Sequence, residues 1–578
     1  MPGPYRVTLL DGFIDEPSIF GVPPYIAPQL RSSAGALHEA AREAGIDLDL
    51  RYQTIDETRR RPELQRQAAD CDLLVVVTGA LVPGNYLRGR PISMREVDAY
   101  GEACRGTVVL GGPVTYGLVK ASLKHVDLFA DGDIDHALHA LLTGKAEGRL
   151  RVLQHGAARS VLGMRSFAEW QRWLVAGASL VEQHPDFPEP LFVELETYKG
   201  CVRYLSGGCA FCSDVRYGVP KFRTPEMLAE EVEALAARGV RHFRVGGQTC
   251  IYCYGSPEVG RSETPRVDPE AVRGLFQAVR EAAGPGLKVL HVDNANPAVM
   301  AAHPEEADRA TEAIVELCTP GNIVAFGLES VDPEVHAANN LNATADDVAR
   351  AAEIVHRRGR ARGGNGMPKL LPGLNFIRGL EGETPGTYAM DLAFLHELKR
   401  RGLVFRRINI RQVNPVRKRF TTRVPKAAFH AFKREVRESF DRPWLQEVAP
   451  VGTVLTDVFT EAREGKMTYG RQVGTYALLV GFVEEVPLRA WVDAVVVSHG
   501  YRSVGALRHP VDINRLPMRA LEVLPGVGRK RAARLARGRP FQSVDEVRAA
   551  LDEGHLLDAL AASLRFGDAA AASGGVGA

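Results

Sequence analysis

The stretch "ETYKGCVRYLSGGCAFCSD", residues 196–214, decides how this chain is interpreted. It holds three of the eight cysteines, at positions 201, 209 and 212, in the pattern C-x7-C-x2-C. A structural zinc site takes four ligands, usually as two closely spaced pairs, and no cysteine or histidine follows Cys212 at the needed spacing. Three thiolates with one position left open suit a 4Fe–4S cluster that binds a small chelating molecule. We therefore predict a cluster on Cys201, Cys209 and Cys212, and keep zinc or a plain electron-transfer cluster as alternatives.

The composition is that of a multidomain globular protein. The chain has 578 residues, of which 45% are hydrophobic and 25% charged, and usual domain sizes then give about three to five domains. The net charge of +2 means that any nucleic-acid site must be local. The N-terminus lacks the pattern of a signal peptide, and no apolar run is long enough to span a membrane. We expect a cytoplasmic protein without a membrane partner, where clustered cysteines more often bind metal than form disulfides.

Strand and helix patterns alternate outward from the cysteine stretch. Six apolar runs, each followed by a helical pattern or a loop, lie at 191–197, 240–247, 287–294, 322–330, 371–379 and 405–413. This rhythm predicts an α/β fold with a parallel (β/α)6-type barrel, complete or open, over residues 191–415. In such barrels the chemistry is placed at the carboxyl ends of the strands.

The same rhythm occurs before residue 150, where near-continuous apolar runs end in glycine. Such runs predict a parallel sheet covered on both faces, and we interpret residues 1–150 as a Rossmann-like domain. Residues 151–190 form a connector rich in Arg, Trp and Pro.

Four motifs in barrel order resemble the radical SAM superfamily, over about residues 190–415. Cys209-x2-Cys212 with an aromatic, Phe211, before the last cysteine matches the cluster motif, although the first spacing is seven residues instead of three. "RVGGQ" (244–248) is similar to the GGE motif, with Gln248 in place of the acid. "GLESVDPEV" (327–335) and "GLNFIRGLEGET" (373–384) resemble the segments of the fourth and fifth strands.

The resemblance implies two cofactors, the 4Fe–4S cluster and S-adenosylmethionine (SAM). It implies SAM-binding roles for Phe211, Gly246, Gly247, Gln248, Glu329 and Ser330. It also implies reductive cleavage of SAM to methionine and a deoxyadenosyl radical, with electrons from a donor protein. No residue is predicted to be catalytic beyond these ligands.

Two further features of this region leave alternatives open. Cys250-x2-Cys253 lies beside the predicted active face, and the two thiols are either ligands of an auxiliary cluster or buried core residues. A Rossmann-like domain before a radical SAM barrel resembles the arrangement of cobalamin-binding enzymes. The cobalt-ligating pattern D-x-H-x-x-G is absent here, so we favour a degenerate domain and keep cobalamin as a second possibility.

The last third of the chain resembles nucleic-acid-binding modules. Residues 416–451 are a basic helical segment, and residues 452–512 are a small β-rich module whose position resembles the TRAM domain of tRNA methylthiotransferases. "LPGVGRKRAARLARGRP" (524–540), within a unit at 513–566, resembles a helix-hairpin-helix motif, whose glycine turn lets backbone N–H groups approach a phosphate. We predict phosphate contacts from Gly526, Gly528, Arg529, Lys530, Arg531 and Arg534. A protein-binding hairpin is the alternative, and residues 567–578 are expected to be a disordered tail.

Together the order of units resembles an uncharacterised class of radical SAM proteins with a C-terminal hairpin motif. We expect an enzyme that modifies a C–H bond, most plausibly on RNA. The two alternatives are a nucleic-acid-binding iron–sulfur protein with a structural or redox cluster, and a cobalamin-dependent methylase of a small molecule.

Overall fold

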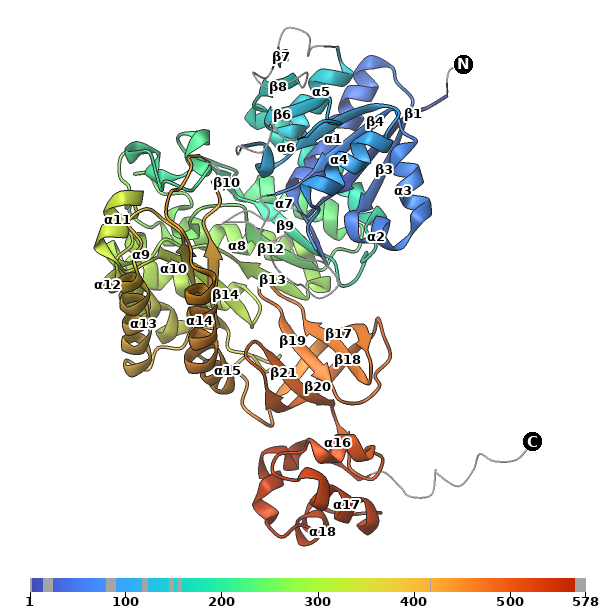
Figure 1. Cartoon of the computed structure of the whole chain (residues 1–578), viewed down its shortest axis with the longest axis vertical. Helices are drawn as coiled ribbons and strands as arrows, with labels where there is room; N and C mark the ends of the chain where they lie inside the picture. The colour runs from blue at the N-terminus through green and yellow to red at the C-terminus, as the bar shows by residue number, and fades with distance from the viewer. Residues whose placement is uncertain are drawn as a thin grey trace, which may run out of the picture.

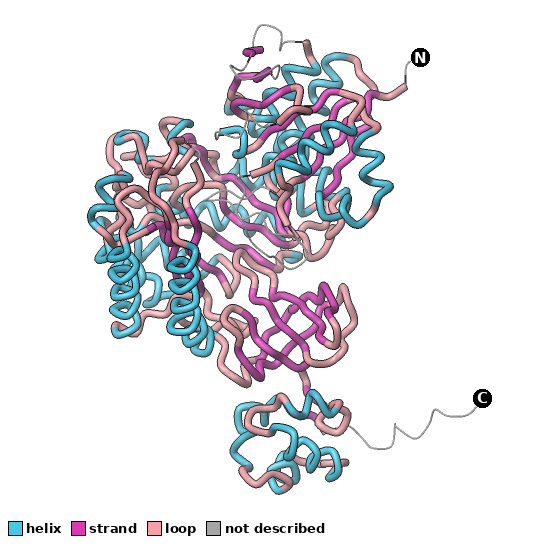
Figure 2. Tube along the Cα trace, viewed as in Figure 1, coloured by secondary structure: helices cyan, strands magenta, loops and turns pink. Residues whose placement is uncertain are grey.

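A computed structural model describes residues 3–13, 24–79, 90–116, 123–144, 150–152, 159–415 and 417–566. Four units follow one another (Figure 1): an N-terminal α/β unit, a second α/β unit, a small β-barrel and a C-terminal group of helices. Figure 2 shows strands in the first three units and mainly helices in the last. The tail predicted at 567–578 lies outside the described residues. No helix within the described ranges has the length and apolar character needed to cross a membrane.

The N-terminal unit is built on a sheet with the strand order β3-β1-β4-β5-β6-β8-β7, parallel except for β7 against β8. Val75 and Val77 of β4 belong to one core cluster and Leu74 and Val76 to another, so both faces of the sheet are covered as predicted. The strands are β1 (Tyr5–Asp11), β3 (Leu48–Thr54), β4 (Leu73–Val77), β5 (Thr107–Gly111), β6 (Leu128–Gly132), β7 (Leu150–Val152) and β8 (Arg159–Gly163). The helices are α1 (Pro28–Ala44), α2 (Ile55–Arg60), α3 (Pro62–Ala69), α4 (Met94–Ala103), α5 (Ile134–Leu142) and α6 (Phe167–Ala176). The sheet reaches Gly163, beyond the boundary predicted at residue 150.

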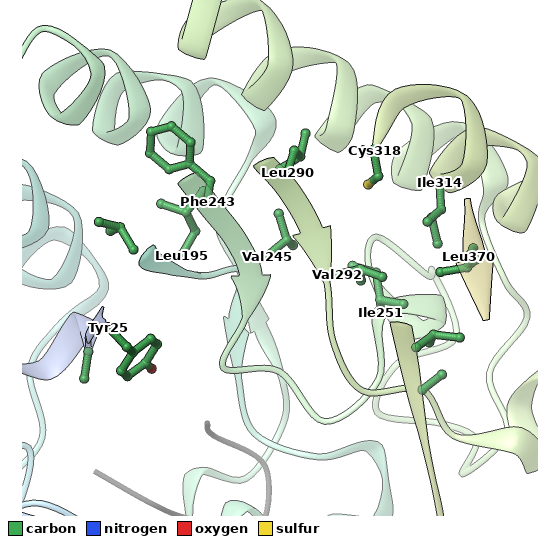
Figure 3. Packing of buried hydrophobic residues seen from close by; sticks show 14 of the residues in the cluster. Tyr25, Leu195, Phe243, Val245, Ile251, Leu290, Val292, Ile314, Cys318 and Leu370 are labelled. Carbon is green, nitrogen blue, oxygen red and sulfur yellow. The ribbon is translucent and has the colours of Figure 1, made fainter. Parts of the chain in front are cut away.

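The second unit contains the six predicted parallel strands, and they form an open barrel. They are β9 (Phe192–Glu196), β12 (His242–Gly246), β13 (Val289–Val292), β14 (Asn322–Glu329), β15 (Leu370–Arg378) and β16 (Arg407–Gln412). Their order is β9-β12-β13 followed by β14-β15-β16, and a bridge between Ala295 and Phe326 joins the two halves. Between them run α7 (Pro225–Ala236), α8 (Pro269–Ala283), α9 (Pro297–Ala302), α10 (Pro304–Leu317), α11 (Pro333–Asn339), α12 (Ala345–Gly359) and α13 (Pro385–Arg400). Figure 3 shows Phe243, Val245, Leu290 and Val292 packed in the core of this unit.

One strand of this barrel comes from the N-terminal part of the chain. Strand β2 (Tyr25–Ile26) pairs in parallel with β9, with Tyr25 opposite Phe192. It lies on the outer side of β9, where a closed barrel would place its sixth strand. The first two units are therefore joined by backbone hydrogen bonds as well as by side-chain contacts.

The C-terminal part begins with the predicted basic segment, which contains α14 (Lys426–Val436) and α15 (Arg442–Val448). A closed five-stranded barrel follows, in the order β17-β18-β19-β21-β20. Its strands are β17 (Val454–Glu464), β18 (Met467–Gln472), β19 (Leu478–Phe482), β20 (Trp491–His499) and β21 (Ser503–Arg508). The last unit has helices α16 (Met518–Glu522), α17 (Gly528–Gly538) and α18 (Val544–Ala549), and these pack largely in a core cluster of their own.

Candidate active site

The cysteine stretch forms a loop at the carboxyl end of β9, the first barrel strand. Strands β10 (Tyr198–Lys199) and β11 (Lys221–Phe222) pair in antiparallel fashion at the base of this loop. The long spacer after Cys201 is taken up by a 3₁₀ turn, Val202–Ser206. The chain then returns through Gly207 and Gly208, both in the left-handed region with φ of 84° and 66°. A Cβ at Gly208 would lie 2.2 Å from Val215 Cγ1, so this return needs glycine.

The three cysteines line one cavity with Phe211, as the sequence motif predicts. Burial raises the pKa of Cys201 to about 12 and also raises the pKa of Cys209 and of Cys212. Opposing this, Arg203 donates a hydrogen bond from Nη1 to Cys209 Sγ at 3.1 Å, which favours the thiolate. A bound metal centre would deprotonate all three thiols, because its positive charge outweighs the cost of burial.

The three sulfurs do not lie as close together as ligation of a single zinc ion requires. Thiolates bound to one tetrahedral zinc at 2.3 Å would lie about 3.8 Å apart. Among the described residues, the three cysteines do not form a set whose ligand atoms all lie within 4.8 Å of one another. In a 4Fe–4S cube each thiolate binds a different iron, so the sulfurs must be farther apart.

Side chains distant in the sequence fix the loop in this shape. Arg203 donates from Nη2 to Asn340 Oδ1 at 3.0 Å, and Asn340 Nδ2 donates to the carbonyl of Gly208 at 2.9 Å. Arg417 donates to the carbonyls of Gly207 and Cys209, each at 2.9 Å. Asn340 itself has a left-handed φ of 51° at the end of α11. The loop is therefore clamped from α11 and from the segment after β16.

Glu329, at the end of β14, lines the same cavity as the three cysteines. Burial raises the pKa of its carboxyl to about 8, although the nearby Arg411 lowers it. Its φ of 68° is unusual for a residue with a side chain, and the β14–β15 register shifts between Gly327 and Glu329. Glu329 Oε2 is buried and has no hydrogen-bond partner among the described residues. A ligand with a hydroxyl or ammonium group would satisfy it.

The glycine turn after β12 packs closely against Glu196 at the end of β9. Gly247 has φ of 67°, and a Cβ there would lie 2.8 Å from Glu196 Cγ. Gln248 is buried, and its side chain accepts from Thr197 Oγ1 at 3.1 Å and donates to the carbonyl of Val245 at 3.2 Å. Gly246, Gly247 and Gln248 are not among the residues that line the cavity.

Ser330 likewise points away from the cavity. It is buried, and its hydroxyl donates to Asp391 Oδ1 at 3.3 Å and accepts from the N–H of Asp332. The predicted SAM contacts that the structure places on the cavity wall are therefore Phe211 and Glu329.

The cavity has room for a ligand larger than water, and its lining carries both apolar and polar groups. Its volume is about 140 Å³, roughly ten times what one water needs. Four asparagines also line it, at positions 294, 296, 342 and 375. With three thiols and the buried carboxyl of Glu329 on its lining, the residues present fit a thiolate-bound cluster and a polar ligand beside it.

The sequence was compared with family profiles and with known proteins, and one family and two relatives match it. The sequence profile of the Radical SAM superfamily matches residues 195–395. An uncharacterised protein of Archaeoglobus fulgidus is 40% identical over 534 residues, which is 91% of this chain and 94% of that protein. An uncharacterised protein of Methanocaldococcus jannaschii is 37% identical over 524 residues, 86% of this chain and 92% of that one.

The chain belongs to the radical SAM superfamily. It is thus an enzyme that uses a 4Fe–4S cluster and SAM, as predicted from the motifs. Among solved structures, the radical SAM methyltransferase TsrM from Kitasatospora setae, with cobalamin and a 4Fe–4S cluster bound, has a TM-score of 0.46 at 15% identity, over 72% of this chain and 74% of that one. The cobalamin-dependent SAM radical enzyme OxsB has a TM-score of 0.45 at 11% identity, over 77% of this chain and 56% of that one.

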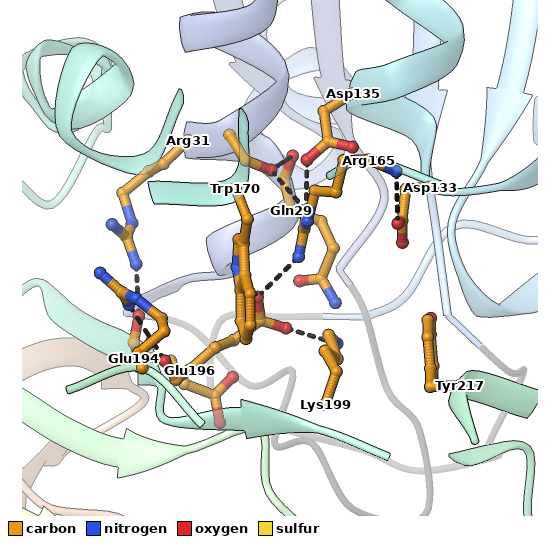
Figure 4. A network of polar contacts seen from close by, with 12 residues as sticks. Gln29, Arg31, Asp133, Asp135, Arg165, Trp170, Glu194, Glu196, Lys199 and Tyr217 are labelled. Carbon is orange, nitrogen blue, oxygen red and sulfur yellow. Dashed lines mark hydrogen bonds and ion pairs between the residues drawn. The ribbon is translucent and has the colours of Figure 1, made fainter. Parts of the chain in front are cut away.

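A buried ionic network joins the N-terminal unit to the radical SAM barrel (Figure 4). Arg165 forms ion pairs with Asp135 of α5 and, at 3.1 Å, with Glu196 at the end of β9. Glu196 also pairs with Lys199 at 2.5 Å and accepts from the indole of Trp170 at 3.1 Å. Burial opposes the charge of Arg165, but these carboxylates raise its pKa above that of a free arginine. The network fixes the start of the cysteine loop against the first unit.

At the other end of the molecule, a glycine turn joins helices α16 and α17 where the sequence predicts a hairpin. Gly526 and Gly528 have left-handed φ values of 70° and 59° between α16 and α17. Arg529 and Lys530 are exposed and have no ion-pair partner in the part of the chain that the structure describes. Arg531 instead pairs with Glu553 at 2.8 Å, and Arg534 pairs with Asp552. The sequence from 523 to 544 contains no acid, but acids from the following turn reach two of its arginines.

Proposed function

We propose that this radical SAM enzyme modifies a C–H bond of a nucleic acid, with RNA favoured, and holds it by the C-terminal hairpin. The observation that carries the proposal is the glycine turn at 526–528 with exposed Arg529 and Lys530 at the start of α17. Backbone N–H groups at such a turn can donate hydrogen bonds to a phosphate without side-chain obstruction. The helix dipole favours the negative charge of the phosphate. Phosphate contacts of this kind give affinity without sequence readout.

The proposed chemistry divides between the cofactors and the chain. When bound, the cluster supplies the electron that cleaves SAM to methionine and a deoxyadenosyl radical. Cys201, Cys209 and Cys212 would hold the cluster, and Arg203 holds Cys209 in place. Glu329 offers a buried carboxyl to a polar group of the ligand. The electron would come from a separate donor protein.

The arrangement of the units favours a long substrate. In Figure 1 the cysteine loop near β10 and the hairpin between α16 and α17 lie at separate parts of the molecule, with the β-barrel between them. A small molecule cannot occupy both places. A folded polynucleotide can place a phosphate at the hairpin and a base or sugar at the cavity.

The test is the salt dependence of RNA binding. If Arg529 and Lys530 each displace a counterion, log affinity should fall with log salt, and Arg529→Ala with Lys530→Ala should flatten the slope by about 1.4 for a single strand. Gly528→Asp should weaken binding as well, because it places a negative side chain at the turn. Arg400→Ala with Arg401→Ala, on α13, removes the same charge elsewhere and serves as the matched control. Unchanged affinity and slope in the hairpin variants would instead support a protein-binding hairpin.

A second candidate is cobalamin-dependent methylation of a small molecule. It is favoured by contacts between the N-terminal unit and the cysteine loop: Tyr116 Oη lies 3.0 Å from Tyr217 Oη, and the Arg216 guanidinium lies 3.8 Å from the Tyr116 ring. Residue 116 follows strand β5 at the carboxyl edge of the sheet, where ligands of doubly wound folds bind. This candidate would be favoured if the purified protein retains cobalamin and the hairpin variants leave RNA affinity unchanged.

A further inference from the structure

Cys250 and Cys253 lie in the turn that follows β12, beside the cluster loop. Cys250 lines the same cavity as Cys201, and Cys253 is fully buried behind it. The N–H of Cys253 donates to the carbonyl of Cys250 at 3.1 Å, which closes a 3₁₀ turn over Ile251–Cys253. The two thiols also interact electrostatically: burial raises the pKa of Cys250 but Cys253 lowers it, and Cys250 raises the pKa of Cys253. Two thiols that meet across one such turn are placed as in C-x-x-C redox pairs.

The turn is held rigidly in this position. The buried hydroxyl of Tyr198 accepts from the N–H of Cys250 at 2.8 Å and donates to its carbonyl at 2.6 Å. The N–H of Asn296 donates to Cys250 Sγ at 3.2 Å. The N–H of Ile251 donates to the carbonyl of Asn294 at 3.0 Å. Cys250 is thus fixed on the cavity wall by both neighbouring loops, which packing of a core cysteine does not require.

The alternative roles of this pair explain less of the geometry. An auxiliary cluster needs ligands beyond these two thiols, and the nearby Cys201 belongs to the predicted radical SAM cluster. Both cysteines belong to the main core cluster, but Cys250 also lines the cavity. Cys318, by comparison, is a single buried cysteine after α10 and does not line the cavity.

We propose that Cys250 and Cys253 form a redox-active dithiol that gives a hydrogen atom to a carbon radical in the cavity and closes to a disulfide. This inference rests on the radical chemistry of the proposed function and adds a reducing step to it. The dithiol would accordingly suit reactions in which the substrate radical becomes a reduced product by gaining a hydrogen atom.

The step balances in atoms and electrons. The Cys250 S–H bond breaks homolytically, and the hydrogen atom forms a new C–H bond on the carbon radical. The sulfur radical then bonds to the Cys253 sulfur, whose proton is released to solvent. The remaining electron leaves to a one-electron carrier of the iron–sulfur or flavin protein class, so that two thiols become one disulfide. A dithiol reductant restores the pair by thiol–disulfide exchange.

The first test follows the disulfide without SAM or substrate. The reconstituted protein is equilibrated anaerobically with dithiothreitol redox buffers, its free thiols are alkylated, and its peptides are analysed by mass spectrometry. We expect the peptide with both cysteines to lose two hydrogens in oxidising buffer, while the iron content stays at about four per chain. Cys250→Ser and Cys253→Ser should each abolish this loss and keep the iron, as Cys318→Ser should leave both unchanged. Loss of iron in either variant would make the pair cluster ligands and overturn the proposal, as would a pair that never oxidises.

The second test follows the hydrogen atom. In D₂O the thiols carry deuterium, so deoxyadenosine formed without substrate should contain deuterium if Cys250 is the donor. Cys250→Ser should lower its deuterium content to natural abundance, because an alcohol O–H bond is too strong to donate, and Cys318→Ser should not. Equal deuterium in the Cys250→Ser product would overturn the proposal while leaving SAM cleavage intact. Absence of deoxyadenosine would count against the proposed function, and the disulfide titration would then decide the inference by itself.

Discussion

Glu329 combines three features that set it apart from an ordinary surface carboxylate. It is buried with its pKa raised to about 8, it has a left-handed backbone, and one carboxyl oxygen lacks a hydrogen-bond partner among the described residues. Each of these is unfavourable for the folded protein without a ligand. Their combination in one residue of the cysteine-lined cavity indicates that the site is built for a bound polar group.

Replacing this carboxyl should affect the ligand and not the cluster. Glu329→Gln is expected to weaken SAM binding, measured by calorimetry on the reconstituted protein, with the iron content unchanged. Glu334→Gln, on the exposed side of α11, is the matched control and should bind SAM normally. Normal SAM affinity in Glu329→Gln would remove Glu329 from the site.

The same residue predicts a pH dependence of stability. Its folded pKa of about 8 lies above the reference value of 4.5, so between these values the folded protein binds more protons than the unfolded chain. The free energy of unfolding of the apoprotein should therefore fall as pH rises from about 4.5 to 8, by up to about 1.4 kcal/mol per pH unit from this group. Denaturant unfolding of Glu329→Gln should show a shallower fall, and an identical pH profile would contradict the raised pKa.

The sequence motifs identified those side chains whose chemistry is local. The cysteines, Phe211 and Glu329 lie at the cavity as predicted. Arg203, Asn340 and Arg417 were missed, because they act through contacts between segments more than 130 residues apart, such as that of Arg203 with Asn340. The position of Ser330 next to Glu329 in the sequence does not reveal that its side chain turns toward Asp391.

At the scale of secondary-structure elements, the strands were predicted well because an apolar run and a turn are local signals. Five of the six barrel strands lie within the predicted runs, and β15 begins one residue before its run, at Leu370. The sequence left open whether the barrel closes, because closure depends on which strands meet at its edges. Strand β2 is only two residues long, Tyr25–Ile26, so no periodicity marks it, yet it pairs with β9.

The turn after β12 yields a prediction about backbone conformation. Gly247→Ala should destabilise the protein by more than the roughly 1–2 kcal/mol that a left-handed backbone costs, because the new methyl would lie 2.8 Å from Glu196 Cγ. Gly402→Ala is the control: its φ is 71° and no atom lies within 4 Å of the added Cβ. Denaturant unfolding should therefore show a larger loss for Gly247→Ala. Equal losses of unfolding free energy in the two variants would mean that the loop shifts to accommodate the methyl group. The close approach to Glu196 would then not contribute to the cost.

On the scale of the molecule, charge placement connects the units. The ion pairs of Arg165 with Asp135 and Glu196 are buried between the first unit and the barrel, whereas the pair of Arg172 with Glu39 is half exposed. Sequence patterns cannot predict such pairs, because the partners come from different elements. The same holds for the hairpin, where Asp552 and Glu553 reach back to α17.

Removing the buried cation should be costly. Arg165→Ala is expected to lower the free energy of unfolding by about 3–5 kcal/mol, since it leaves the buried Asp135 without its cation and Glu196 with Lys199 alone. Arg172→Ala breaks the exposed pair and should cost at most about 1 kcal/mol. Thermal unfolding followed by circular dichroism compares the two variants. A loss for Arg165→Ala as small as that for Arg172→Ala would show that the units are joined by β2 and apolar contacts alone.

We propose that SAM cleavage takes place at the cluster cavity independently of the C-terminal hairpin, and one measurement tests that proposal most directly. The reconstituted protein is reduced with dithionite, given SAM, and assayed for deoxyadenosine by mass spectrometry. We predict that the wild-type protein and the Arg529→Ala, Lys530→Ala variant both form deoxyadenosine slowly without substrate, and that Cys209→Ala forms none. If the wild-type protein keeps an intact, reduced cluster and still forms no deoxyadenosine, the account of the site is wrong.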